Sequence, residues 1–289
     1  MRKRVCVLQV TPEHPNPEHI KYFKDRDDCD FYFVTHDAPN PDALKFCPDT
    51  TWTDTRNTLV EMVPRNYDYY AFIDHDYILR PQGELGVLEQ MLHDLQRFEP
   101  AVLTFYPGKG IHTPYSGNEE YRKSRQYSII PFTHAAYKVV HHSLLDWFFP
   151  MVTKFGGGFN SCHLFNILEI PFLKNVVCSH GIIYDNGQSN SSTPHNRDGA
   201  KSHQGMQDMW MWILPAFKHI KIVDLYFGTP DAKYDSLSIK NAFMGIFKDK
   251  DLSPVPSSPT IDYLEHEKLK NFFDLDHGYF KEKKWEIAD

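Results

Sequence analysis

Cysteine is scarce in this sequence, and none of its five cysteines stands in a CxxC pair. An odd number of cysteines without paired spacing argues against a zinc-ribbon site and against a disulfide framework, and indicates free thiols in a reducing compartment. Long hydrophobic runs are also missing, because no stretch approaches the roughly 20 apolar residues that span a bilayer. The apolar run that follows residues 2–4 is too short for a secretory signal. We therefore expect no signal peptide and no transmembrane segment, and either a soluble cytoplasmic protein or a catalytic domain cut from a longer chain.

Runs of basic residues are equally rare. Lysine and arginine gather only at residues 2–4 and 281–284, and the formal net charge is −7. This balance does not favour nucleic acid or an anionic membrane as a partner. The phosphate-loop, dinucleotide-binding, GxSxG and HExxH motifs are absent too, which removes the enzyme classes that depend on them.

What the sequence does contain is enough apolar material for a sizeable core, at 41% hydrophobic residues. Strand-like and helix-like patterns alternate over the first 106 residues, which favours a parallel, Rossmann-like α/β sheet. The expected strands are 4–10, 31–35, 69–73 and 101–106, and the expected helices are 15–24, 54–63 and 86–98. Thr53 or Asp54 is the expected N-cap of the second helix.

The rest of the chain is less regular. A polar loop is expected at 107–125, and the segment 187–204 is typical either of a lid or of disorder. Further elements are expected as an extended segment at 126–140, helices at 143–152, 160–170 and 207–217, and strands at 175–179 and 219–224. The last sixty residues are mixed and polar, and we expect them to wrap the core or to mediate contacts.

The most informative segment is an apolar strand that runs directly into Asp74, His75 and Asp76. In an extended backbone, residues two positions apart point to the same side, so both carboxylates can face one point. Open α/β sheets bind ligands at the carboxyl ends of their strands. Two converging carboxylates favour a shared cation, and carboxylates combined with phosphate oxygens suit Mg²⁺ or Mn²⁺.

These residues resemble the DxD motif of the GT-A glycosyltransferases. The segment 53–57, which contains Arg56 and Asn57, resembles the helix that many such enzymes place beside the nucleotide. The resemblance covers roughly residues 4–106, with a looser similarity to about residue 225. It implies a mixed Rossmann-like sheet flanked by helices, with a C-terminal extension on the acceptor side.

The resemblance also implies a division of labour along the chain. Residues 1–106 would bind the nucleotide sugar, residues 107–230 would form the acceptor-binding half of the same domain, and residues 231–289 would be an extension. The enzyme would move a hexosyl or pentosyl group from a UDP- or GDP-linked donor to a glycan, a glycoconjugate or another hydroxyl acceptor. The oligomeric state is left open.

Individual roles follow from the same resemblance. The loops after the first two strands would hold the base and ribose, and Arg56 would either neutralise the diphosphate or order the DxD loop. A surface salt bridge is the ordinary alternative for Arg56. The candidate nucleotide contacts are Thr11, Thr35, Asp37, Arg56, Asn57, Asp74 and His75, and the candidate metal ligands are Asp74, Asp76 and His180.

His180 is chosen from sixteen histidines because it ends a short apolar strand, as the third metal ligand of the family does. Asp208 is the candidate catalytic base, since it begins a helix after a reduced form of the family's acidic acceptor motif. In the family, however, the base precedes the metal histidine. Either Asp208 reaches in from another element, or the enzyme retains configuration and needs no such base.

The aromatic content of 15% leaves two interpretations open. Trp147, Phe148, Phe149 and Phe155 form either an acceptor platform or core packing. Three other functions remain alternatives. A nucleotidyltransferase would want a basic, glycine-rich loop after the first strand, a metal-dependent phosphoesterase would need clustered histidines and aspartates, and a sugar-binding module would not need the acidic pair.

Overall fold

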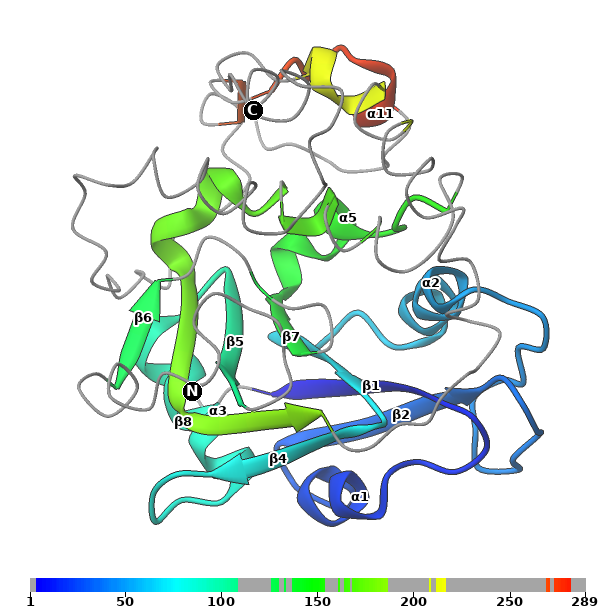
Figure 1. Ribbon diagram of the computed structural model, residues 1–289, viewed down its shortest axis with the longest axis vertical. Helices are drawn as coiled ribbons and strands as arrows, with labels where there is room; N and C mark the ends of the chain where they lie inside the picture. Colours follow the sequence, from blue (N-terminus) through cyan, green and yellow to red (C-terminus); the bar gives the residue numbers. More distant parts are fainter. Residues whose placement is uncertain are drawn as a thin grey trace, which may run out of the picture.

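The computed structural model describes residues 4–108, 126–129, 133, 137–153, 161, 164–166, 168–186, 208, 212–216, 269–270 and 273–281. An eight-stranded mixed sheet lies at its centre, in the order β2-β1-β3-β7-β5-β8-β4 with β6 paired to β8 (Figure 1). The strands are β1 (Val5–Thr11), β2 (Cys29–Thr35), β3 (Tyr69–Asp74), β4 (Tyr77–Pro81), β5 (Val102–Pro107), β6 (Tyr127–Ile129), β7 (Tyr137–His141) and β8 (Val176–Asn186). The helices are α1 (Pro17–Phe23), α2 (Trp52–Met62), α3 (Val87–Phe98), α5 (Leu145–Phe148) and α11 (Gly278–Lys281), with 3-10 turns η1 (His142–Leu144), η2 (Ile170–Asn175) and η4 (Leu214–Ala216).

The first three strands confirm the expected Rossmann-like arrangement. β1 lies between β2 and β3 and is parallel to both. All seven residues of β1 are buried, as expected of a strand that is covered by helices on both faces. Helices α1 and α2 provide the two connections and lie on opposite faces of the sheet (Figure 1). The carboxyl ends of these strands therefore meet at one edge.

The remainder of the sheet is mixed rather than parallel. β7, which comes late in the sequence, inserts between β3 and β5 and is antiparallel to both. β4 was not expected at all, and it pairs with β8 at the opposite end of the strand order. Only His75 and Asp76 separate β3 from β4. The turn that carries the DxD motif therefore links the middle of the sheet to its edge.

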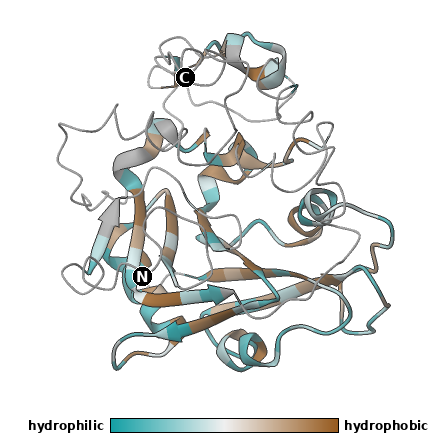
Figure 2. Cartoon of the chain, in the orientation of Figure 1, coloured by the Kyte–Doolittle hydropathy of each residue, from teal (hydrophilic) through white to brown (hydrophobic). Residues whose placement is uncertain are grey.

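Hydrophobic residues run along the strands of the sheet (Figure 2). Alternate residues of the strands supply two separate cores. On β1, Cys6 and Leu8 face the core shared with α2, whereas Val5 and Val7 face the core shared with α3. On β3, Tyr70 and Phe72 have the first orientation, whereas Tyr69, Ala71 and Ile73 have the second. By the same period of two, Asp74 belongs to the α2 side of the sheet.

Helix α2 begins earlier than the sequence pattern predicted. Its N-cap is Thr51, whose hydroxyl accepts a hydrogen bond from the backbone N–H of Asp54, and the Asp54 carboxylate in turn accepts from the backbone N–H of Thr51. This reciprocal capping box satisfies two free donors of the first turn. The expectation of Thr53 or Asp54 as N-cap is therefore wrong by two or three residues. The helix includes Trp52, four residues before Arg56.

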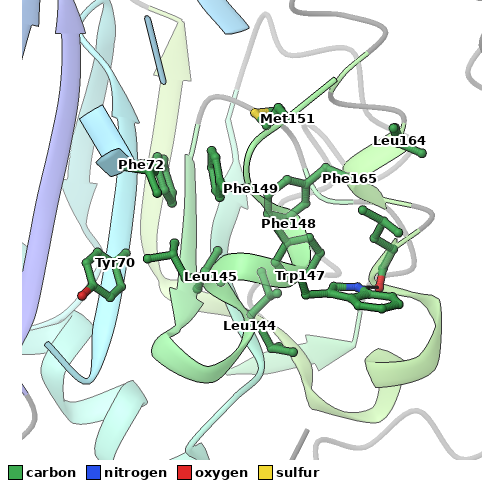
Figure 3. Packing of buried hydrophobic residues seen from close by; sticks show 14 of the residues in the cluster. Tyr70, Phe72, Leu144, Leu145, Trp147, Phe148, Phe149, Met151, Leu164 and Phe165 are labelled. Atoms are coloured by element: carbon green, nitrogen blue, oxygen red, sulfur yellow. Dashed lines mark hydrogen bonds between the residues drawn. The ribbon is translucent and has the colours of Figure 1, made fainter. Parts of the chain in front are cut away.

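The aromatic segment after β7 packs into the core instead of forming a platform (Figure 3). Trp147, Phe148 and Phe149 are all nearly or completely buried. The Phe148 and Phe165 rings stack at 3.9 Å, and Phe149 stacks on Phe72 of β3 at 4.7 Å. The core interpretation is confirmed for these three residues. Phe155 lies outside the described residues.

A buried ion pair joins β7 to the segment before β8. Lys138 Nζ donates to Glu169 Oε1 at 3.0 Å, and the Thr133 hydroxyl also donates to that carboxylate. Burial raises the pKa of Glu169 above its ordinary value, although Lys138 opposes this effect. A pair of this kind is costly to break because one buried charge is left uncompensated. It fixes β7 beside the aromatic core.

The second half of the chain departs from expectation in several places. The expected helix at 143–152 is confined to η1 and α5, while the described residues of 160–170 include a helical stretch. β8 continues to Asn186, so the prediction that this strand ends at His180 is wrong. The segments 187–204 and 219–224 lie outside the described residues. No helix in the described part of the chain has the length and apolar character needed to cross a membrane.

Candidate functional site

The predicted ligand loops meet at the carboxyl edge of the three parallel strands. Val10 pairs with Asp74, and Thr11 pairs with Thr35. Both threonines are fully buried, and the Thr11 hydroxyl donates to the carbonyl of His14. They form the base of the two loops. The parallel register thus brings the ends of these three strands together.

The carboxylate of Asp74 is held by two side chains of α2. Arg56 Nη2 donates to Asp74 Oδ1 at 2.6 Å, and Trp52 Nε1 donates to the same oxygen at 3.1 Å. Trp52 and Arg56 lie one helical turn apart, so both reach the same strand end. No described hydrogen bond or ion pair uses Asp74 Oδ2, and the Asp74 side chain is 21% exposed. This geometry leaves one carboxylate oxygen for a ligand.

Arg56 makes a buried ion pair rather than a surface salt bridge. Its side chain is only 5% exposed. The guanidinium carbon lies 3.7 Å from the Trp52 ring centroid and 5.7 Å from that of Phe72. An arginine enclosed in this way has few alternative rotamers, and its pair with Asp74 is shielded from solvent. Arg56 is therefore held against the first aspartate of the Asp74–His75–Asp76 turn.

A second set of contacts clamps the DxD turn from the side of β1. Asn16 Nδ2 donates to the backbone carbonyl of His75 at 2.8 Å. The backbone N–H of Asn16 donates to Gln9 Oε1, and Gln9 Nε2 lies 2.6 Å from His19 Nδ1. Gln9 and His19 are both fully buried. This chain of contacts was not expected from the sequence, although a glutamine inside an apolar strand was a usable signal.

Three histidines surround the same edge. Burial is the main cause that lowers the pKa of His19 to about 4, with a contribution from nearby His75. The pKa of His36 is also lowered, first by burial and also by His75, although a hydrogen bond from His36 to Asp37 opposes this. His75 thus contributes to both pKa shifts, and its backbone carbonyl accepts the hydrogen bond from Asn16.

Two other candidate nucleotide contacts, Asn57 and Asp37, also have partners within the protein. The Asn57 amide donates to the Met151 carbonyl at 2.9 Å and accepts from the Met151 N–H at 2.7 Å. These reciprocal bonds occupy Asn57 on the side of α2 away from Asp74. The Asp37 side chain is 47% exposed, and its carboxylate contacts His36 at 2.7 Å.

The strand register separates His180 from the DxD turn. Tyr77, which follows Asp76, pairs with Asn186, six positions after His180 on β8. Because β8 has a bulge within this stretch, the length of six extended residues, roughly 20 Å, is an upper limit for the separation along the strand. His180 is buried, and its ring packs against Tyr106 at 4.9 Å. Among the described residues, His180 belongs to no group of three side chains that could hold a metal ion, which does not support it as the third ligand.

Metal coordination at this edge would rest on few protein ligands. Among the described residues, no group of three or more histidine, cysteine, aspartate or glutamate side chains is arranged to hold an ion. Asp76 is half-buried in the turn, and Asp74 has one oxygen committed to Arg56 and Trp52. Mg²⁺ and similar ions often bind through only one or two carboxylates, with phosphates and water completing the shell. The two aspartates fit that type of site. Asp208 is helical and exposed.

Comparison with solved structures places this arrangement among known folds. The crystal structure of GalNAc-T7 with UDP, GalNAc and Mn²⁺ superposes with a TM-score of 0.54 at 5% identity, over 85% of this chain and 55% of that one. The fold is similar to the GT-A glycosyltransferase fold. The match therefore spans about half of the GalNAc-T7 chain.

Other comparisons add little. The crystal structure of A197 from STIV matches with a TM-score of 0.38 and 11% identity, over 62% of this chain and 83% of that one, which is too weak to support an argument. No protein-family model matches the sequence. No curated protein matches it either. The likeness to GalNAc-T7 thus concerns the fold.

Proposed function

We propose that this protein is a glycosyltransferase that uses a UDP- or GDP-linked sugar donor and a divalent cation, Mn²⁺ or Mg²⁺. The observation that carries the proposal is the Asp74–His75–Asp76 turn, which is fixed at the carboxyl edge of three parallel strands. Ligands of open α/β sheets bind at such an edge. The similarity to the fold of GalNAc-T7 supports a transferase over the nucleotidyltransferase and phosphoesterase alternatives.

The two aspartates take different parts in this proposal. Asp76 is the main protein ligand of the cation, and Asp74 contributes the oxygen that Arg56 and Trp52 leave available. A bound cation would supply positive charge against the donor's diphosphate. Thr11, Thr35, Asp37 and His75 surround the base and ribose, with the two buried threonines shaping the loops. The acceptor is a glycan or glycoconjugate bound by the second half of the chain.

Calorimetry with UDP and with GDP tests the proposal directly. Wild-type protein should bind one of the two in MnCl₂ and lose most of that affinity in EDTA. Asp76→Asn should weaken the Mn²⁺-dependent binding by about tenfold or more, because a cation ligand loses its charge. Glu84→Gln is a matched control, since Glu84 is exposed in the loop between β4 and α3. Equal nucleotide binding in Mn²⁺ and in EDTA would remove the metal role and, with it, the basis of the proposal.

Asp208 is proposed as the general base that takes the proton of the acceptor hydroxyl. Such a base affects the chemical step and leaves donor binding unchanged. Asp208→Asn should therefore lower kcat by at least about a hundredfold while the nucleotide affinity stays within error of wild type. An unchanged kcat would exclude Asp208 and favour a reaction with retention of configuration.

A further inference from the structure

Helix α2 has a second side that also forms part of a concave site. At about 100° per residue, Asp54, Thr58 and Glu61 lie on one face of the helix, opposite to Trp52 and Arg56. That outer face lines a pocket of about 500 Å³. The segment 150–153 forms another wall, and Trp212 and Tyr279 contribute aromatic side chains. One helix thus separates the Asp74 site from a second cavity.

The walls of this pocket are held by hydrogen bonds that do not involve a ligand. The paired bonds between Asn57 and Met151 fix the segment 150–153 against α2. The Thr53 and Ser161 hydroxyls lie 3.0 Å apart, and Ser161 donates to the Val152 carbonyl at 2.8 Å. A cavity whose walls are already braced loses little conformational entropy when it binds a ligand.

The chemistry of the lining is amphipathic and carries negative charge. Asp54 and Glu61 are the charged members among the described lining residues, and neither lysine nor arginine is found among them. A phosphate-bearing ligand would therefore be repelled. Asp54 also accepts hydrogen bonds from Thr51 at the first turn of α2, where the helix dipole offsets its charge. The carboxylates can consequently act as hydrogen-bond acceptors for neutral donors.

The aromatic part of the pocket completes this pattern. Trp212 is half-buried, and its ring meets Tyr279 edge-on at 5.2 Å. Tyr279 is almost fully buried, so its contact fixes the indole in place. Rigid indole and phenol rings present apolar surface, while carboxylates and threonine hydroxyls offer hydrogen bonds. Neutral carbohydrates combine apolar C–H faces with a rim of hydroxyl groups and match both components.

We propose that this pocket is a binding site for a neutral glycan, distinct from the nucleotide site and separated from it by α2. Its volume falls within the range of about 300–1,000 Å³ that is typical of small-molecule sites. The proposal does not depend on the transferase activity. Trp212 supplies the apolar contact, and Glu61 accepts hydrogen bonds from the sugar hydroxyls.

Saturation-transfer NMR and calorimetry with chitobiose, lactose and maltose test this inference in EDTA and without nucleotide. At least one of these disaccharides should bind. Trp212→Ala should weaken the binding by about tenfold, which corresponds to about 1.4 kcal/mol, since one aromatic contact is lost. Glu61→Gln should weaken it about threefold, and because Glu61 is exposed this variant avoids any doubt about folding. The control Glu84→Gln should bind like wild type.

Two further measurements distinguish the proposed glycan pocket from the proposed nucleotide site. Asp76→Asn should bind the disaccharide normally while its Mn²⁺-dependent nucleotide binding falls. Glucosamine should displace the bound disaccharide no better than neutral N-acetylglucosamine does if the carboxylates of the pocket act as hydrogen-bond acceptors. The proposal is overturned if none of the disaccharides binds, if Trp212→Ala and Glu61→Gln both leave binding unchanged, or if only the amine binds. None of these results affects the nucleotide titration.

Discussion

The pairing of Arg56 with Asp74 makes a quantitative prediction for the DxD turn. Arg56→Met removes the positive charge but keeps much of the side-chain volume between Trp52 and Phe72. Asp74 then remains partly buried without its counter-charge. We expect this variant to lose about 3 kcal/mol of the free energy of unfolding.

This magnitude follows from the geometry of the pair. Breaking a buried ion pair costs about 3–5 kcal/mol, and the 21% exposure of Asp74 reduces that cost through solvent screening. The loss of the cation–π contact with Trp52 adds on the order of 1 kcal/mol. Of these two contributions to the loss of stability, only the ion pair involves Asp74. A double-mutant cycle with Asp74→Asn should therefore give a coupling energy of about 2 kcal/mol.

Urea denaturation of the four proteins in EDTA measures this coupling. The exposed pair Arg65–Asp146 serves as a matched control, because its side chains are 48% and 60% exposed and its atoms lie 3.3 Å apart. We expect its coupling to stay below about 0.5 kcal/mol. Excess Mn²⁺ should stabilise Arg56→Met more than wild type, since a cation can replace the guanidinium. A coupling for Arg56 and Asp74 no larger than that of the control would refute the reasoning.

Two further predictions concern the contacts beside the turn. Asn16→Asp keeps the cap of α1, where the side chain accepts from the Glu18 N–H, but loses the donor to His75. Calorimetry should show Mn²⁺-dependent nucleotide binding weakened by about tenfold. Wild-type affinity would mean that the hydrogen bond from Asn16 to His75 has no functional role. His19 has a pKa of about 4 in the folded protein and binds a proton more readily when unfolded, so its contribution to stability is present above the unfolded pKa of 6.5 and is lost as the pH falls. Between pH 7 and pH 5, the free energy of unfolding should fall by about 2 kcal/mol less in His19→Gln than in wild type, as measured by urea denaturation. The same pH dependence in both proteins would contradict this.

The fold of the N-terminal half could be predicted because its signals are local. β1 is apolar except for Gln9 and Thr11, β3 is a continuous apolar run that ends at Asp74, and α3 has a strong apolar stripe. These features depend on residues within one element. The meeting of the strand ends then follows from the geometry of parallel sheets.

The remaining features depend on contacts between distant segments. β4 has only five residues, and its partner β8 lies about a hundred positions later in the chain. The bulge that bends β8 near His180 is a property of its pairing with β5, which no local pattern reports. The contact of Trp52 with Asp74 depended on the correct start of α2, since Trp52 and Arg56 share a face only if both are helical. The Thr51–Asp54 capping box was the available signal.

The shortness of the link between β3 and β4 limits how the chain can change. Side chains alternate along β4, with Tyr77 and Leu79 inside and Ile78 and Arg80 outside. Adding or deleting a single residue in the link would exchange these two sets, burying an arginine and exposing a tyrosine and a leucine. The number of residues between the two aspartates therefore determines which side chains of β4 are buried. The identity of the residue between them does not. Length variation in related chains should be excluded here and tolerated in the loop between β4 and α3.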